Sequence, residues 1–440
     1  MTRRTQRDSG GRPAGASNDD GRPDALPVPA LHSAGRVRLR VLGTAVTLLE
    51  PLRRRAMQEL GIELDFDVLD GVTAQRRAAL QPSSYDVYDQ WFHNIAVVWS
   101  SGALQPIRTA RLRLWDDLVR ENLAIGIRSR LGSPADTPQE RLYVQADLRL
   151  GGLPAERISA VPTVFNVDAF GYLPEALPRE LAAAEESWGW LLDDRLRGRV
   201  ALVADATIGA ADAAMASSAL GLVRFGEIDR PTIDEIDQLV RLLIRKRQAG
   251  HFAGLWQSTA EARALMLEGG AAVESMWSPT LIDLRACGVP VRYARPREGY
   301  RAWHGCLALS AHLRGRALDA AYEYINWWLA GWPGAVMARQ GYYFAIPSRV
   351  QAELSAAEWG YWYQGEAART ALCDPYGRTA VRPGEAREGG AQWQRLSHIG
   401  VWSSTVPEHN HLVRRWGQFL AADITTARSG RETAAAPAWG

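Results

Sequence analysis

The sequence predicts an α/β fold organised as two domains. Apolar residues alternate from Val37 to Val41, a helix-like stretch follows at 49–60, and a second alternating stretch occupies 62–68. Strand, helix and strand at this spacing form a βαβ unit, whose two strands normally lie parallel. The chain has 440 residues, and 47% of them are hydrophobic. That length and composition are sufficient for two domains, each with its own core.

Local signals support the individual elements. In the first helix, Pro51 suits the first turn, and Gly61 can adopt the left-handed conformation that ends a helix. Thr232 and Glu235 form a capping box at the start of a later helix, and Ser258 begins another. Further strands are predicted at residues 85–88, 200–203 and 271–276.

Charge and composition exclude several functional classes. The 51 Lys and Arg residues are scattered and nearly balance the 49 Asp and Glu residues, which argues against nucleic acid as the main partner. Lys246 is the only lysine, and it lies in the basic run Arg245-Lys246-Arg247. A phosphate-binding loop and a pyridoxal Schiff base each need a lysine elsewhere. Neither chemistry is therefore expected.

The two ends of the chain have the composition of tails. Residues 1–35 are rich in Gly, Pro, Asp, Arg and Ser, so we predict a disordered N-terminal tail, and a C-terminal tail at 426–440. No apolar segment like that of a secretory signal follows Arg3-Arg4, and no stretch reaches the roughly 20 apolar residues of a membrane span. The sequence predicts no transmembrane segment and shows no recognisable signal peptide. A cytoplasmic location therefore stays open.

Tryptophan is unusually abundant, with 17 residues. Trp91, Trp277 and Trp303 each stand just after an apolar, strand-like run. That position is the carboxyl end of a strand, where open α/β sheets bind ligands. We interpret these three side chains as walls of a ligand site, with packing in the core as the alternative.

Motifs of catalysis are largely missing from the sequence. It contains no GxSxG, GxGxxG or HExxH pattern, and its three cysteines form no CxxC pair. Glu408-His409-Asn410-His411 lacks a third ligand residue at a recognisable spacing, so no metal site is predicted. Cys306, close to His304, could be a nucleophile, although a buried structural thiol explains it as well. The sequence therefore predicts no catalytic residue and no cofactor.

Six runs, in this order and spacing, carry a family resemblance: VLGT at 41–44, YDVYDQW at 85–91, VPTVFN at 161–166, ESMW at 274–277, PREGYRAW at 296–303 and QGY at 340–342. Together they resemble the extracellular solute-binding proteins of polyamine-type (spermidine/putrescine-like) ABC transporters. The resemblance spans about residues 36 to 425.

This resemblance implies a two-lobe, periplasmic-binding-protein-like fold with a ligand cleft between the lobes. Lobe one would hold 36–160 plus about 292–345, and lobe two 161–291 plus about 346–425. The implied function is that of the solute-binding component of an ABC importer, which closes over a small organic ligand and passes it to permease subunits. The ligand would be cationic, polyamine-like or smaller, and the location periplasmic or extracellular. An enzyme on the same scaffold and a cytoplasmic ligand sensor are the alternatives.

The resemblance also assigns a candidate site. The family pattern would place carboxylates where this sequence has Ala45, Ile208 and Gly305, which implies a ligand smaller than spermidine or with a single charge. Asp205 would be the remaining carboxylate, although an aspartate before 206–208 is also a good helix N-cap. The positions that match ligand-contacting places of the family are Thr44, Trp91, Asp205, Trp277, Trp303 and Tyr342.

Overall fold

A computed structural model describes residues 36–123, 131, 138–404 and 406–423 of the chain. The two predicted tails, 1–35 and 426–440, lie outside the described residues. The strands are β1 (Arg38–Gly43), β2 (Glu63–Val68), β3 (Val87–Trp91), β4 (Leu104–Gln105), β5 (Ile107–Arg108), β6 (Tyr143–Val144), β7 (Leu150–Gly151), β8 (Arg157–Ile158), β9 (Val161–Tyr172), β10 (Val200–Val203), β11 (Phe252–Trp256), β12 (Val273–Met276), β13 (Arg292–Tyr293), β14 (Tyr300–Ser310), β15 (Tyr343–Phe344), β16 (Leu372–Cys373), β17 (Thr379–Val381) and β18 (Ile399–Trp402).

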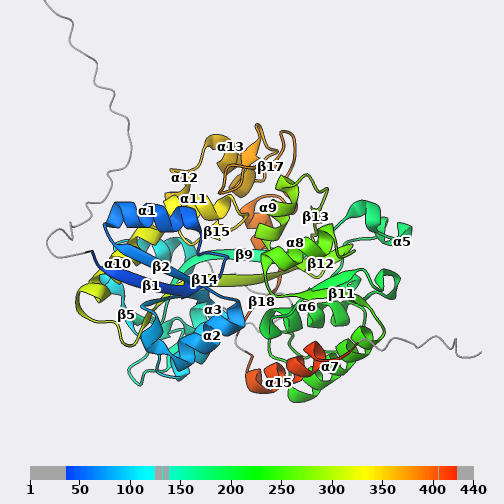
Figure 1. The fold of residues 1–440 in the computed structure, drawn as a ribbon, viewed down its shortest axis with the longest axis horizontal. Helices are drawn as coiled ribbons and strands as arrows, with labels where there is room; N and C mark the ends of the chain where they lie inside the picture. Colours follow the sequence, from blue (N-terminus) through cyan, green and yellow to red (C-terminus); the bar gives the residue numbers. More distant parts are fainter. Residues whose placement is uncertain (1–35, 124–130, 132–137, 405, 424–440) are drawn as a thin grey trace, which may run out of the picture.

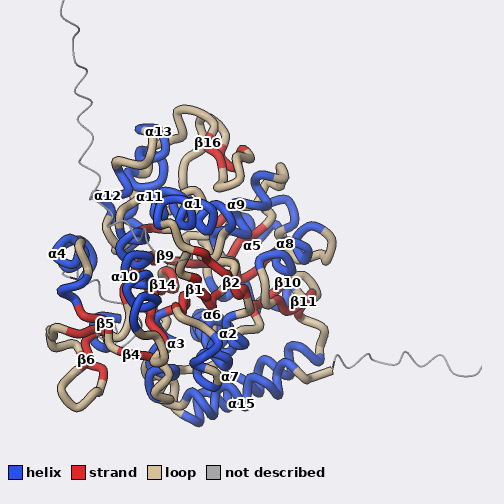
Figure 2. Tube along the Cα trace, turned by 60° about the vertical axis from the view of Figure 1, so that its left-hand side comes forward, coloured by secondary structure: helices blue, strands red, loops and turns tan. Residues whose placement is uncertain are grey.

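Helices cover both faces of the main sheet (Figures 1 and 2). They are α1 (Glu50–Leu60), α2 (Gly71–Leu80), α3 (Phe92–Ser100), α4 (Trp115–Leu118), α5 (Arg179–Ala182), α6 (Ala206–Ala219), α7 (Ile233–Gln248), α8 (Thr259–Leu267), α9 (Ser278–Ala286), α10 (Gly315–Leu329), α11 (Trp332–Ala338), α12 (Pro347–Gln351), α13 (Ala356–Trp359), α14 (Gln392–Leu396) and α15 (His409–Leu420).

The predicted βαβ unit at the start of the chain is confirmed. Strands β1 and β2 pair in parallel, with Arg38 opposite Glu63. Helix α1 connects them, and Leu52 and Ala56 are buried on its inner side. Gly61 follows with a φ of 64°, in the left-handed region that glycine adopts without a steric penalty. The predicted α/β class therefore holds from the first unit onwards.

Two long antiparallel strands, β9 and β14, form the middle of the main sheet, whose order is β11-β10-β12-β9-β14-β3-β1-β2. The beginning of β9 pairs with β14 and β15, and its last four residues, 169–172, pair with β12. Strand β14 pairs with β3 through its second half and with β18 through its first residues. The sheet thus has a first half (β3, β1, β2) and a second half (β12, β10, β11), joined by the β9/β14 ribbon.

The last described segment of the chain returns to the second half of the sheet. Helix α15 packs against α6 and α7, at the lower right of Figure 1. Strand β13 pairs with the far end of β9, at Gly171 and Tyr172. The strand that leads back across to the first half is therefore β14. These pairings support a division into two lobes, whose residue boundaries stay a prediction.

Candidate functional site

The β9/β14 ribbon places polar side chains on one of its faces. Arg301 lies opposite Asp168, and Trp303 lies opposite Asn166. Because alternate residues of a strand point to the same face, these four side chains share one side of the ribbon. They stand where the two halves of the sheet meet.

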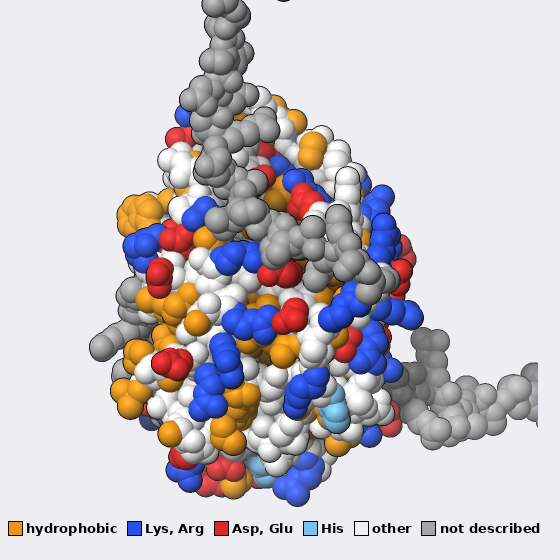
Figure 3. Space-filling view, turned by 90° about the vertical axis from the view of Figure 1, so that its left-hand side faces the viewer, with side chains coloured by type: hydrophobic (Ala, Val, Ile, Leu, Met, Phe, Trp, Pro, Cys, Tyr) orange, Lys and Arg blue, Asp and Glu red, His pale blue; other side chains and the backbone are white. Residues whose placement is uncertain are grey.

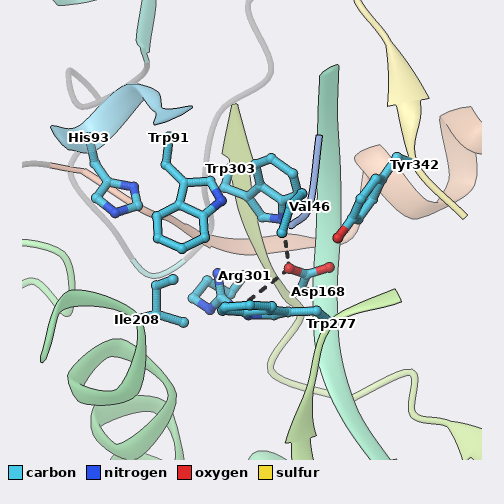
Figure 4. Close-up of a pocket in the computed structure, with 9 residues that line it drawn as sticks. All are labelled: Val46, Trp91, His93, Asp168, Ile208, Trp277, Arg301, Trp303 and Tyr342. Carbon is cyan, nitrogen blue, oxygen red and sulfur yellow. Dashed lines mark hydrogen bonds and ion pairs between the residues drawn. The ribbon is translucent and has the colours of Figure 1, made fainter. Parts of the chain in front are cut away.

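A small cavity lies against this face of the ribbon (Figure 4). Its volume is about 10 Å³, which is room for about one water molecule. Four of the six predicted site residues line it. The full lining is Val46, Trp91, His93, Asp168, Ile208, Trp277, Arg301, Trp303 and Tyr342.

The aromatic walls come from both halves of the sheet. Trp91 is the last residue of β3, and Trp277 follows β12 directly; their ring centroids are 5.5 Å apart in an edge-to-face arrangement. Trp277 also packs edge-on against Trp256, with the centroids 4.8 Å apart. Trp303 meets Tyr342 edge to face at 5.2 Å. Side chains from the two halves therefore close the cavity together.

A buried arginine forms the charged floor of the cavity. Arg301 is 1% exposed, and its Nε donates to Oδ1 of Asp212 at 2.7 Å. Its Nη1 donates to the hydroxyl of Ser403 at 3.2 Å. Its Nη2 lies 3.6 Å from Oδ2 of Asp168, an ion-pair distance that is too long for a hydrogen bond. Arg301 thus links α6 of the second half to the central ribbon.

Asp168 is the acidic counterpart on the ribbon. Its Oδ2 accepts a 2.6 Å hydrogen bond from the indole nitrogen of Trp303, and its Oδ1 accepts one of 2.9 Å from Asn166. Burial raises the pKa of Asp168, and the charge of Arg301 opposes that shift. Burial likewise raises the pKa of Asp212, to about 6. The charge of Arg301 favours the ionised form of both carboxyls.

His93 contributes a neutral ring to the cavity wall. It lies in the first turn of α3 and stacks on Trp91, with the ring centroids 5.8 Å apart and the planes 9° from parallel. Burial lowers the pKa of His93 to about 3, and the charge of Arg301 acts in the same direction. The imidazole is therefore uncharged near neutral pH.

The two other predicted site residues do not line the cavity. Asp205 is the N-cap of α6, and its Oδ1 accepts from the backbone N–H groups of Thr207 and Ile208, both at 2.9 Å. The helix-cap alternative is therefore realised, and burial raises the pKa of this carboxyl. Thr44 is buried in the loop after β1, and Val46 two residues later reaches the cavity.

Sequence reasoning missed Asp168, Arg301, His93 and Val46. A usable signal existed for the first two, because each is a charge inside an otherwise mostly apolar stretch, 161–172 and 300–310. A charge in a buried strand needs a partner, so such a residue marks either an ion pair or a site. His93 and Val46 gave no comparable signal.

The proposed nucleophile, Cys306, has the features of a structural thiol. It is buried, its Sγ donates to the carbonyl of Gln90 at 3.2 Å, and burial raises the pKa of the thiol well above its usual value. His304 stacks on Trp402 instead, with the centroids 5.2 Å apart. Its own pKa is lowered to about 3 by burial. Two groups in these protonation states do not form an activated pair.

On the face in Figure 3, Lys and Arg side chains are interspersed with Asp and Glu. Within the described ranges, no group of three or more His, Cys, Asp and Glu side chains is placed to hold a metal ion. No helix among the described residues has both the length and the apolar character needed to cross a membrane.

Comparison with known proteins gives the same fold and a family. Similar solved structures include a putative spermidine/putrescine ABC transporter from Listeria monocytogenes (TM-score 0.60, 12% identity, covering 87% of this chain and 99% of that one). The Tp0655 (TpPotD) lipoprotein of Treponema pallidum is also similar (0.57, 12%, 87% and 99%). So is AgtB from A. tumefacien R10, solved in complex with agropinic acid (0.54, 13%, 88% and 99%). No curated protein sequence matches the chain.

These likenesses confirm the predicted two-lobe α/β fold of periplasmic binding proteins. The family description that matches is "Bacterial extracellular solute-binding protein", over residues 143–395. That range is more than half of the chain, and it includes Asp168, Trp277, Arg301, Trp303 and Tyr342. The predicted role in solute binding for ABC transport is confirmed at the level of the family. The chain belongs to the bacterial extracellular solute-binding proteins.

Proposed function

We propose that this protein is the solute-binding component of an ABC importer and closes its two lobes over one small organic ligand that carries a positively charged group. The observation that carries the proposal is the contact between Trp91 and Trp277, from the two halves of the sheet, in a cavity that is also lined by the buried acid of the ribbon, Asp168. A solute held there would touch both lobes at once, so its binding energy would favour the closed form.

The charges around the cavity favour a cation. Asp168, Asp205 and Asp212 are three carboxyls around the guanidinium of Arg301, and the charge of Arg301 opposes the rise in the pKa of each. The three acidic side chains around Arg301 favour a positively charged group in the cavity. The faces of the tryptophan rings attract cations as well, because their quadrupole is negative over the face.

The size of the cavity requires an opening motion. Sites for small organic molecules occupy about 300–1,000 Å³, whereas this cavity measures about 10 Å³. Since β9 and β14 are continuous strands between the halves, a change in their bend or twist would separate Trp91 from Trp277. We infer that the ligand enters a more open form and that the lobes then close on it.

Location, partners and the lack of catalysis follow from the family. The family is described as extracellular, so we propose that the protein acts in the periplasm or outside the cell and meets permease subunits there. We also propose that it is not an enzyme, because its family is one of solute-binding proteins and the one nucleophile considered, the Cys306 thiol, is buried with a raised pKa.

A thermal-shift screen tests the proposal with polyamines, amino acids, quaternary amines, small acids and neutral sugars. A ligand at a hundred times its Kd adds about 2.7 kcal/mol to the stability of the folded state, which is readily measured. We expect one or more small amines or ammonium compounds to raise the Tm. If only sugars or purely anionic acids raise it, the proposed cationic ligand is wrong.

A further inference from the structure

Arg301 has one donor group that the protein leaves unused. Its Nε and Nη1 bond to Asp212 and Ser403, whereas Nη2 is buried and has no hydrogen-bond partner among the described residues. A buried N–H group without a partner is unusual and destabilising. Arg301 lines the cavity, so an acceptor placed there could supply the missing bond.

The nearest acid does not supply that bond. Oδ2 of Asp168 lies 3.6 Å from Nη2 and already accepts the 2.6 Å hydrogen bond from the indole of Trp303 (Figure 4). Arg301 and Asp168 therefore present two different groups to a ligand in the cavity: the N–H donor of Nη2, which has no partner, and the carboxylate of Asp168.

We propose that the ligand is a zwitterion: its carboxylate accepts a hydrogen bond from Nη2 of Arg301, and its ammonium group lies toward Asp168 and the aromatic rings. This inference rests on the proposed function, because it refines the class of ligand for the same cavity. It adds a negative group to the ligand and a specificity-determining role for Arg301.

Electrostatics explains why a simple cation fits less well. A cation in a cavity this small is close to the positive guanidinium of Arg301 as well as to Asp168, so part of its attraction is cancelled. A carboxylate on the same ligand is attracted by the guanidinium of Arg301 and can accept a charge-assisted hydrogen bond from it. A diamine also fits poorly, because its second ammonium group would have no acidic partner: Ile208 lines the wall with an apolar side chain.

The test is isothermal titration of the full chain with matched pairs of probes. Glycine betaine and choline share a trimethylammonium group and differ in the carboxylate. Straight-chain ω-amino acids of two to six carbons are compared in the same way with the n-alkylamines of equal chain length. We expect at least one carboxylate-bearing probe to bind at least tenfold more tightly than its partner. Equal or tighter binding of choline and the alkylamines overturns the zwitterion while keeping the cationic ligand; no binding by any probe overturns both.

A pair of variants locates the effect. Arg301→Lys keeps the charge but loses the geometry of the guanidinium donors, so the preference for the carboxylate-bearing probe should fall at least fivefold. Arg395→Lys is the matched control, because Arg395 is a buried arginine outside the cavity that donates to the carbonyls of Glu388 and Val167. An equal loss of preference in both variants would contradict a specific role for Arg301. If Arg301→Lys does not fold, the probe pairs on the unaltered chain decide.

Discussion

The indole rings of Trp91 and Trp277 meet edge to face, with centroids 5.5 Å apart and planes 61° apart. One ring ends a strand in the first half of the sheet, and the other follows a strand in the second half. Their separation therefore measures how far the two halves are apart. This contact leads to the first prediction, on the shape of the protein in solution.

Ligand binding should make the protein more compact. Because the site is shared between halves that are joined by β9 and β14, a bound solute stabilises the arrangement in which Trp91 and Trp277 are close. Small-angle scattering should give a smaller radius of gyration with a saturating ligand from the thermal-shift screen. An unchanged radius, for a ligand whose affinity depends on Trp277, would show that no hinge motion accompanies binding.

Replacing Trp303 by Phe should weaken binding by about tenfold or more. The substitution keeps an aromatic wall but removes the N–H that holds Asp168 at 2.6 Å, and hydrogen bonds to charged groups contribute about 1.5–3 kcal/mol. Trp327→Phe is the matched control, since its indole also donates to a carboxylate at 2.6 Å, that of Glu59, outside the cavity. Calorimetry should show weaker binding for the first variant alone. A similar loss of affinity in both would point to general destabilisation.

Asp205→Asn separates the helix cap from a role in binding. Asparagine caps a helix about as well as aspartate, so the Tm should stay nearly unchanged. If the carboxylate attracts the ligand, affinity for a cationic group should fall by about 1.5–3 kcal/mol. Asp205→Ala should in addition lower stability by about 0.5–2 kcal/mol, because the bonds from Thr207 and Ile208 are lost. Unchanged affinity in Asp205→Asn would leave Asp205 with the cap alone.

Spermidine should bind poorly. Ile208 is 2% exposed and lines the cavity with an apolar side chain, at a position where the resemblance to polyamine-binding proteins would imply a carboxylate. Burying an ammonium group without a partner costs several kcal/mol, and Ala45 and Gly305 offer no acidic side chain either. Titration calorimetry should find spermidine weaker than the preferred small ligand. Submicromolar binding of spermidine would restore the polyamine assignment.

Acid should weaken the fold partly through His93. Its pKa is lowered from about 6.5 to about 3 by burial, so the unfolded chain binds more protons than the folded one between these values. Stability therefore rises with pH across this range and falls on acidification. Asp212, whose pKa is raised to about 6, acts in the opposite direction between its usual pKa near 4 and pH 6.

The variant His93→Gln should reduce the loss of Tm between pH 6.5 and pH 4.5, measured by thermal unfolding. His304→Gln is the control, because that histidine has the same lowered pKa but lies away from the cavity. Both variants should lose less Tm on acidification than the unaltered chain, and His93→Gln alone should change the affinity for the ligand. If Tm falls with pH as steeply in His93→Gln as in the unaltered chain, protonation of His93 does not contribute to the acid sensitivity of the fold.

The sequence by itself determined the local elements of this protein and indicated most of the aromatic residues that line the cavity. The βαβ unit, the capping box of Thr232 and Glu235, and strands close to the expected positions are all present. These features depend on the periodicity of neighbouring residues and on hydrogen bonds within a single turn. Trp91 and Trp277 could be predicted to line the cavity because each stands at the end of a recognisable strand. The same prediction was wrong for the position of Trp303, which lies within β14 and not at the end of a strand.

Only the tertiary structure decided which charges meet in the site. Asp168 and Arg301 face one another because β9 and β14 pair antiparallel in one register, and a shift of one residue would turn either side chain to the other face. Pairing between strands so far apart in the sequence depends on the packing of the whole sheet, and no local pattern specifies it. Asp205, by contrast, could be predicted from its neighbours alone: an aspartate before 206–208 is a good helix N-cap, and Asp205 caps α6.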